Sequence, residues 1–262
     1  MRSRIAARRR RRLAAAVGGG TIALVAGACV PQPATTQGRT IADLWVVFAV
    51  AATVVGLIVW GLVTWSILRY RRRGEGLPPQ TPGNIVAEIV WTVLPVITVL
   101  ALFVLTFRAT DAIDQPAAQP AVNVDVNAFT WQWSFSYRDA GVQIVGSPDA
   151  QPELVVPVGE PIRITLTSTD VDHAFYVPTF LFKRDAIPGH PSTFDFTVVA
   201  PGVYPGQCAE FCGLHHDTMR FTVRAVDRPT FDAWLASRRA AASSSGSSPA
   251  DSPPAASASA QP

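Results

Sequence analysis

The sequence predicts a two-helix transmembrane hairpin followed by an all-β domain of the sandwich or Greek-key barrel type. Two long apolar runs, at 44–68 and 85–107, predict the hairpin. Short segments in which apolar and polar residues alternate, such as 121–126 and 219–223, predict the β domain. Of the 262 residues, 48% are hydrophobic and only 16% are charged, and this composition fits a protein that lies partly in lipid.

The first 28 residues have the layout of a secretory or lipoprotein-type leader. Residues 1–12 contain seven Arg, and an uncharged stretch of small and apolar residues follows. The stretch ends at Cys29 in a setting similar to a lipoprotein cleavage box, although Ala26 stands where Leu is usual. Two interpretations stay open: a lipidated Cys29, or a signal peptide or uncleaved span with an incidental cysteine. Residues 29–40 are expected to form a short linker.

Residues 41–108 are expected to form the hairpin. A helix over 44–68 would be roughly 37 Å long at ~1.5 Å per residue, enough to cross the ~30 Å hydrocarbon core. The Arg cluster at 69–73 should stay in the cytoplasm, so both ends of the hairpin should lie outside. The second run carries a single charge, Glu88, and contains Pro95, which should kink the helix.

Residues 109–240 are expected to form the β domain. Alternating patterns and turn residues predict strands at 121–126, 153–156, 161–166, 194–198 and 219–223. A short closing helix is predicted over 229–239. Residues 241–262 consist of Ser, Ala, Pro and Gly with little else, and this composition predicts a disordered tail.

Charge is divided between the two halves of the chain, although the net charge is only +3. Residues 1–108 contain thirteen Arg and three acidic residues, which gives +10; residues 109–240 contain nine basic and fifteen acidic residues, which gives −6. An acidic outer domain suits a basic protein partner and does not suit nucleic acid. The candidates for attracting such a partner are Asp139, Asp170, Asp172 and Asp185.

The segment 208–219 carries the chemistry. Its thiolate, imidazole and thioether groups together favour copper. A mononuclear blue-copper site uses one Cys, so Cys208 and Cys212 favour two bridged copper ions. A structural zinc site would need a second ligand pair at the usual spacing. A disulfide between the two cysteines is the plain alternative.

The remaining ligands are sought among the histidines and methionines. His216 lies four residues after the second Cys, and Met219 lies three residues further on, so both can reach the same site. The adjacent His215 is an equally close imidazole, and local order does not choose between the two. His173 follows a predicted strand and would otherwise be an ordinary core or surface histidine, but the site lacks a ligand that it can supply.

Three stretches resemble subunit II of cytochrome c oxidase: 208–219, 168–189 and the aromatic run 131–137. The resemblance covers most of residues 41–235. It implies that residues 109–240 form an extracytoplasmic cupredoxin domain with two copper ions, a CuA centre. It also implies that Cys208 and Cys212 bridge the ions, and that the other ligands are His173, His216, Met219 and the backbone carbonyl of Glu210.

The same resemblance implies partners and a path for electrons. Cytochrome c would deliver electrons at an exposed Trp131, whereas Trp133 fits a buried strand position. The haem of subunit I would receive the electrons and reduce dioxygen to water, coupled to proton translocation, in a bacterial cell-membrane complex with subunit III and lipid. The Glu210 side chain would reach a magnesium ion at the subunit I interface. Glu88 would lie at the cytoplasmic mouth of a proton path, or would simply be an interfacial residue.

Other copper proteins fit less well. A metallochaperone with a thioredoxin-like fold also uses Cys-x3-Cys and a distant His, but there the His follows the cysteines, whereas His173 precedes Cys208. The copper domain of nitrous oxide reductase accompanies a large His-rich domain, and this chain has four His. A quinol oxidase subunit would lack the ligands. No Cys-x2-Cys-His motif is present, so no haem c is expected on this chain.

Overall fold

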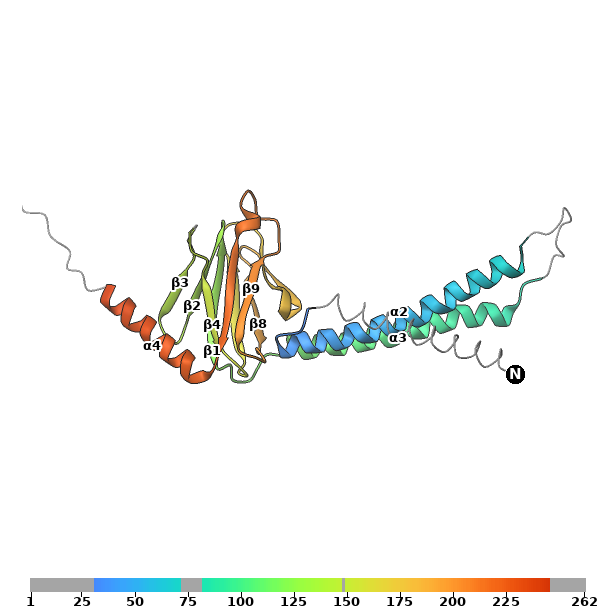
Figure 1. Cartoon of the computed structure of the whole chain (residues 1–262), viewed down its shortest axis with the longest axis horizontal. Helices are drawn as coiled ribbons and strands as arrows, with labels where there is room; N and C mark the ends of the chain where they lie inside the picture. The colour runs from blue at the N-terminus through green and yellow to red at the C-terminus, as the bar shows by residue number, and fades with distance from the viewer. Residues whose placement is uncertain (1–30, 72–81, 148, 246–262) are drawn as a thin grey trace, which may run out of the picture.

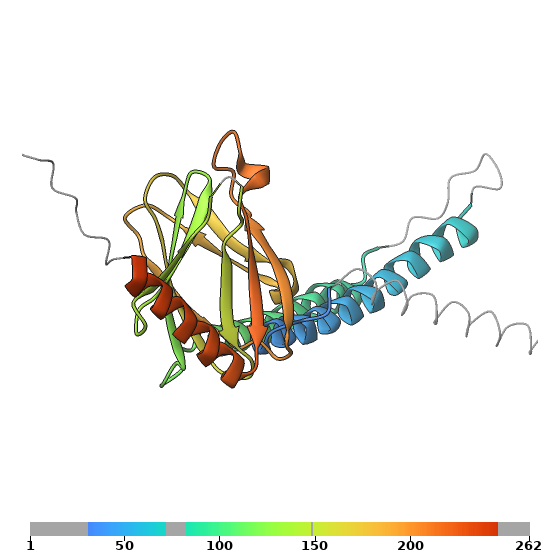
Figure 2. The same cartoon turned by 60° about the vertical axis from the view of Figure 1, so that its left-hand side comes forward.

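Two long helices extend from one end of a β-sandwich, and a shorter helix packs on its opposite side (Figure 1, Figure 2). The computed structural model describes residues 31–71, 82–147 and 149–245. The leader, Cys29, and Arg72 and Arg73 of the 69–73 Arg cluster lie outside the described residues, and so do residues 246–262 of the predicted tail.

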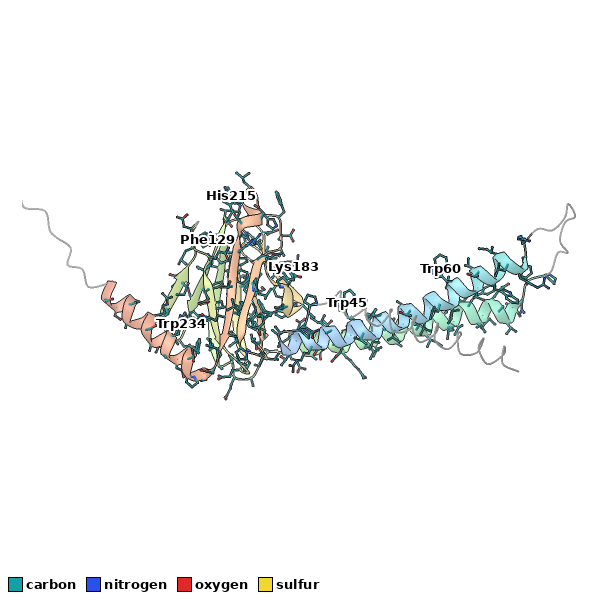
Figure 3. All side chains as sticks on the ribbon, viewed as in Figure 1. Trp45, Trp60, Phe129, Lys183, His215 and Trp234 are labelled. Carbon is teal, nitrogen blue, oxygen red and sulfur yellow. The ribbon has the colours of Figure 1, made fainter. Side chains whose placement is uncertain are left out.

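The hairpin consists of α2 (Thr36–Arg69) and α3 (Ile85–Asp114). With 34 and 30 residues, the helices are about 51 and 45 Å long at ~1.5 Å per residue, so both can cross a membrane and project beyond it. α3 continues on both sides of Pro95. Their large apolar side chains are exposed, as lipid-facing groups would be; Trp45 and Trp60 on α2 are 60% and 71% exposed (Figure 3).

Both helices extend further toward the β domain than predicted. α2 begins before 41 because Thr35 caps it: the Thr35 hydroxyl accepts a hydrogen bond of 2.9 Å from the Gly38 amide. α3 ends at Asp114 rather than at 107, so its last turns lie in the region predicted for the β domain. The apolar pattern marks the stretch that suits lipid, whereas the ends of a helix are set by its caps and contacts.

The β domain is a sandwich of two five-stranded sheets, ordered β3-β2-β1-β5-β8 and β4-β10-β9-β6-β7. β1 pairs parallel with β5, and β4 with β10; the other pairs in the described residues are antiparallel. All five predicted strands are present, and the cupredoxin-like prediction is confirmed in place of a thioredoxin-like one. The strands are β1 (Val122–Phe129), β2 (Gln132–Tyr137), β3 (Val142–Val145), β4 (Glu153–Pro157), β5 (Ile162–Ser168), β6 (His173–Val177), β7 (Phe182–Ala186), β8 (Ser192–Phe196), β9 (Gly202–Cys208) and β10 (Arg220–Val226).

An aromatic cluster fills the core between the sheets. Trp133 on β2 is fully buried, as predicted, and its ring centroid lies 5.2 Å from that of Phe221 on β10. The Phe221 ring stacks on Phe175 of β6 at 4.6 Å. Rings of this size bury large apolar areas and pack in few arrangements, so they fix the strands that carry the functional loops.

The closing helix α4 (Arg228–Ser245) is longer than predicted and includes residues 241–245, which were expected to be disordered. Its first turns are held by Phe231 and Trp234, whose rings pack on Tyr137. Arg239 donates hydrogen bonds to two backbone carbonyls of the β2–β3 turn. Because these contacts fix most of the helix, it can continue into a polar, Ser-rich segment.

The start of α2 is attached to the β domain through the backbone. The Ala34 amide donates to the carbonyl of Thr179, in the short 3-10 helix η1 (Pro178–Phe180), at 2.8 Å. The Ala34 carbonyl accepts from Val199 at 2.9 Å, and the Thr36 amide donates to Thr197 at 3.0 Å. This segment therefore forms an isolated antiparallel β-bridge, Thr35 with Val198 just after β8, before the helix begins.

The end of α3 is attached by charged groups. Arg163 forms a two-pronged ion pair with Asp195, at 2.9 and 2.8 Å, and also donates to the Ala117 carbonyl at 2.7 Å. The Asp195 carboxylate accepts from the Ala117 amide at 2.6 Å. Asp114, the last residue of α3, pairs with Arg184 of β7. Each end of the hairpin that meets the sandwich therefore has its own attachment.

Replacing Gly38 by Ala should destabilise the attachment of α2. An added Cβ would lie 2.7 Å from the carbonyl oxygen of Phe180, and a backbone oxygen cannot easily move away. We expect the free energy of unfolding to fall by about 1–3 kcal/mol, measured by thermal unfolding of the full chain in detergent. Gly56→Ala on the same helix is the control, because its Cβ meets no atom within 4 Å. A Gly38 variant as stable as that control would contradict the close contact.

Candidate metal centre

The predicted ligands come from two neighbouring strands and the loop between β9 and β10. β6 begins at His173, β9 ends at Cys208, and Phe175 lies opposite Cys208 in the sheet. The loop is closed at its base, because the Cys208 amide donates to the Met219 carbonyl at 2.9 Å. The loop and its 3-10 turn η2 (His216–Thr218) project from one end of the strands (Figure 2).

Two thiols lie side by side at this end of the sandwich. The Sγ atoms of Cys208 and Cys212 are 3.9 Å apart, and both residues are buried and free. A disulfide requires about 2.05 Å between sulfur atoms, so the disulfide alternative does not describe this structure. Three residues lie between the two cysteines, so the loop can turn both sulfur atoms toward the same space.

Each thiol has its own imidazole. Nδ1 of His173 lies 3.7 Å from Sγ of Cys208, and Nδ1 of His216 lies 3.5 Å from Sγ of Cys212. The Met219 sulfur is 3.8 Å from Cys212, and the Glu210 carbonyl oxygen is 3.3 Å from Cys208. Ligand atoms of His173, Cys208 and Cys212 all lie within 4.8 Å of one another, and this group can hold a metal ion.

The structure separates the two adjacent histidines. His216 turns its Nδ1 toward Cys212, as described above. His215 is exposed at the tip of the domain (Figure 3). Its ring packs nearly perpendicular to that of Trp131, with 4.7 Å between ring centroids. Of the two imidazoles, His216 is therefore the one in reach of the thiols.

Trp131 contacts the loop directly. Its indole Nε1 donates a hydrogen bond of 3.1 Å to the carbonyl of Cys212. Because its ring lies on the loop, Trp131 is half-buried rather than exposed. Gly213 makes this approach possible: its φ of +116° suits glycine, and a Cβ there would lie 3.3 Å from the indole nitrogen.

The charges of the three buried groups depend on one another. Burial raises the pKa of the Cys208 thiol, but contacts with His173 and with nearby backbone outweigh it and lower the pKa to about 6. Burial, and then the negative charge of Cys208, raise the pKa of Cys212 to about 12. Burial lowers the pKa of His173, yet Cys208 and Asp170 raise it overall. The first thiolate thus forms readily, and a cation is needed to hold the second.

The other predicted residues lie apart from the thiols. The Glu210 carboxylate is at the surface, where it accepts from Lys183 at 3.2 Å. Lys183 also pairs with Asp185 at 3.3 Å. Glu88 lies in the first turn of α3, at the end of the hairpin away from the β domain (Figure 1).

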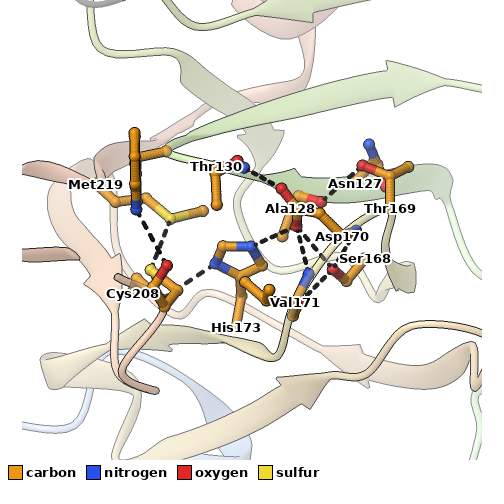
Figure 4. A network of polar contacts seen from close by, with 12 residues as sticks. Asn127, Ala128, Thr130, Ser168, Thr169, Asp170, Val171, His173, Cys208 and Met219 are labelled. Atoms are coloured by element: carbon orange, nitrogen blue, oxygen red, sulfur yellow. Dashed lines mark hydrogen bonds and ion pairs between the residues drawn. The ribbon is translucent and has the colours of Figure 1, made fainter. Parts of the chain in front are cut away.

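The four acidic candidates differ in their contacts. All four residues are exposed; Asp139 accepts a hydrogen bond from Asn123, and Asp185 pairs with Lys183. Asp170 contacts the ring of His173 (Figure 4). Nothing in the sequence distinguishes Asp170 from Asp172, because both precede His173 in an exposed loop and the direction of each side chain depends on the fold.

Comparisons with known proteins agree with one another. The profile of the transmembrane domain of cytochrome c oxidase subunit II matches residues 24–109, and that of its periplasmic domain matches residues 145–226. A probable cytochrome c oxidase subunit 2 of Streptomyces avermitilis is 33% identical over 246 residues, covering 79% of this chain and 77% of that protein. The cytochrome c oxidase subunit 2 of Corynebacterium glutamicum is 30% identical over 270 residues, covering 79% and 75%.

Among solved structures, the periplasmic domain of subunit II of the cytochrome oxidase of Bradyrhizobium japonicum is similar. It is 32% identical, with a TM-score of 0.44, and the match covers 48% of this chain and 99% of that one.

Replacing Gly213 by Ala should loosen metal binding as well as the fold. Both Gly213 and Gly141 have positive φ, so Ala at either position should cost about 1–3 kcal/mol of stability. Only at Gly213 would the added Cβ meet the Trp131 indole, since a Cβ at Gly141 has no neighbour within 4 Å. Copper retained after dialysis against a chelator should therefore fall for Gly213→Ala and not for Gly141→Ala. Equal retention would show that the indole contact does not shape the loop.

Proposed function

The chain belongs to the cytochrome c oxidase subunit 2 family, and from this premise we propose that it accepts electrons from cytochrome c at a dinuclear copper centre. The electrons then pass to the haem of subunit I, where dioxygen is reduced to water and protons are translocated. The arrangement of two unbonded thiols 3.9 Å apart, each with its own imidazole, is the observation that carries this proposal.

The donor set fits copper. Thiolate, imidazole and thioether are ligands that suit copper, and oxygen-seeking cations such as magnesium prefer other groups. Cys208 and Cys212 would be shared by two ions, with His173 on one side and His216 on the other. The Met219 sulfur and the Glu210 carbonyl oxygen would supply the remaining donors.

The protein around the donors suits electron transfer. When bound, the two copper ions supply a one-electron relay. The chain holds the donors on β6, at the end of β9 and on a loop closed by a backbone hydrogen bond, so their positions change little when the charge changes. His173 and Met219 are fully buried, which keeps water from the ligand atoms. With every position filled by protein, the site relays electrons and leaves oxygen chemistry to subunit I.

Trp131 is proposed to receive the electrons from cytochrome c. Its indole reaches the Cys212 carbonyl through one hydrogen bond, so a short path of bonds joins the indole to the Cys212 sulfur. The balance of −6 over residues 109–240 would attract a basic cytochrome.

The membrane placement follows from the hairpin. Two long apolar helices and the match to the family's transmembrane domain make this a membrane protein with a periplasmic domain. We propose the bacterial plasma membrane, with subunits I and III as neighbours.

Glu210 is proposed to bind magnesium where subunit I meets the loop, after exchanging its contact with Lys183. Glu88 is proposed to lie at the mouth of a proton path.

His216→Ala should abolish the dinuclear centre, and His215→Ala should preserve it. Only His216 has its Nδ1 3.5 Å from a thiol, whereas His215 packs on Trp131. Electron paramagnetic resonance of the copper-loaded full chain distinguishes the cases, because two equivalent copper nuclei split the signal into seven lines and one nucleus into four. We expect seven lines from the wild type and from His215→Ala. A wild type that binds only zinc, or gives four lines, would refute the dinuclear site.

Trp131→Phe should slow electron transfer from cytochrome c about tenfold or more, since ~1.4 kcal/mol of added barrier is enough for that factor. Phenylalanine keeps an aromatic ring but cannot donate to the Cys212 carbonyl. Stopped-flow reduction of the centre by reduced cytochrome c measures the rate. Trp60→Phe on α2 is the control, because that indole is 71% exposed on the hairpin. Equal rates in both variants would remove Trp131 from the electron path.

A further inference from the structure

The carboxylate of Asp170 links the proposed copper site to the turn that carries Trp131. Asp170 lies in the turn between β5 and β6. Its Oδ1 is 2.9 Å from Nε2 of His173, and its Oδ2 accepts a hydrogen bond of 2.6 Å from the Thr130 amide (Figure 4). Thr130 directly precedes Trp131, so one side chain contacts both a proposed metal ligand and the turn that carries the proposed electron acceptor.

The turn around Asp170 holds this carboxylate in place. The Val171 amide donates to its Oδ1 at 2.7 Å. The Ser168 hydroxyl donates to the Val171 carbonyl at 2.5 Å and accepts from the Asp170 amide at 3.3 Å. The Asp170 side chain is only 29% exposed. Such a braced carboxylate cannot turn toward a protein partner without breaking several hydrogen bonds.

The contact with His173 directs the imidazole. With Nε2 held by Asp170, the opposite nitrogen, Nδ1, points at Cys208. A carboxylate behind a metal-binding histidine fixes both the ring orientation and the position of its proton. His173 is fully buried, so no water replaces this partner.

The contact with Thr130 completes a continuous network of contacts that starts at Asp170 and reaches both cysteines. From Asp170 one arm runs through His173 to Cys208, and the other runs through Thr130 and Trp131 to the Cys212 carbonyl. The two arms meet at the thiol pair. A shift of the Trp131 turn is therefore transmitted to the imidazole through a single carboxylate.

We propose that Asp170 is a positioning residue that locks His173 and the Trp131 turn into one rigid unit, rather than a surface charge that attracts cytochrome c. This inference rests on the proposed function, because it concerns the orientation of a ligand toward copper.

Three variants of the full chain test the assignment. Asp170→Asn has one acceptor in place of two, so it can keep the contact with His173 or with Thr130, but not both. Asp170→Glu keeps the charge and moves the carboxylate by one methylene. Asp172→Asn removes the same charge two residues away, from an exposed side chain, and is the matched control.

Two readouts distinguish positioning from charge attraction. Copper affinity should fall by about 10- to 100-fold in Asp170→Asn and Asp170→Glu, and the imidazole hyperfine couplings of the loaded centre should differ from those of the wild type. Reduction by a small uncharged reductant should slow in the same two variants. Asp172→Asn should alter only the salt dependence of the reaction with cytochrome c. Restoration by Asp170→Glu, or an Asp170→Asn variant that matches the control, would overturn the positioning role.

A third readout does not depend on copper. Hydrogen exchange of the Thr130 amide in the copper-free chain should be faster in Asp170→Ala than in Asp172→Ala, because alanine at position 170 offers this amide no acceptor. If the wild type binds no copper pair, the proposed function fails, but the exchange difference still tests whether Asp170 holds the Thr130 amide. If the wild type is a working dinuclear centre and exchange is equal in the two variants, only the positioning role fails.

Discussion

The pairing of β6 with β9 is the constraint on which the metal centre depends. Phe175 opposite Cys208 brings His173 beside the thiol, although 35 residues separate them in the chain. The hydrogen bond between Cys208 and Met219 then returns the loop to β10 and encloses the other donors. One slip of this register would turn alternate side chains to the opposite face and remove the imidazole from the site.

Packing beneath the strands keeps this register. Trp133, Phe175 and Phe221 come from both sheets and meet in one cluster directly under the loop. An interior packed in this way resists small displacements, because any shift opens gaps or creates clashes. This rigid core fixes the positions of the strands that carry the ligand residues. A centre that is proposed to transfer electrons needs ligand atoms that move little when its charge changes.

Regular patterns in the sequence predicted most of the architecture. The two apolar runs and the five alternating segments correspond to α2, α3 and five of the ten strands. The ends of the helices were not predicted, because they depend on contacts with residues distant in the chain: Ala34, just before α2, bonds to Thr179 and Val199, and Asp114, at the end of α3, pairs with Arg184. At the candidate site, residue types and spacing predicted that the two thiols and Met219 share one site, and their sulfur atoms lie close together in the structure, with 3.9 Å from Cys208 to Cys212 and 3.8 Å from Cys212 to Met219.

The direction in which a side chain points was harder to predict than which residues belong to the site. His215 and His216 are equivalent in local order, and only the turn at η2 shows which ring faces Cys212. Asp170 and Asp172 pose the same problem, since a charge pattern records that an acid is present and not where it points. The half-buried Trp131 is a further case, because its indole is covered by a loop some 81 residues away in the sequence.

The double attachment of the hairpin has a mechanical consequence. A tether at one point would leave the copper-binding domain free to pivot, like the mobile carrier domains that shuttle between donor and acceptor. Here the backbone bridge at Ala34 and the arginine clamp at Ala117 hold the sandwich at two separate places on the membrane side. The domain is thus held in a fixed position, and the distance that the proposed electron transfer to a neighbouring subunit would have to cross is set once, when the chain folds.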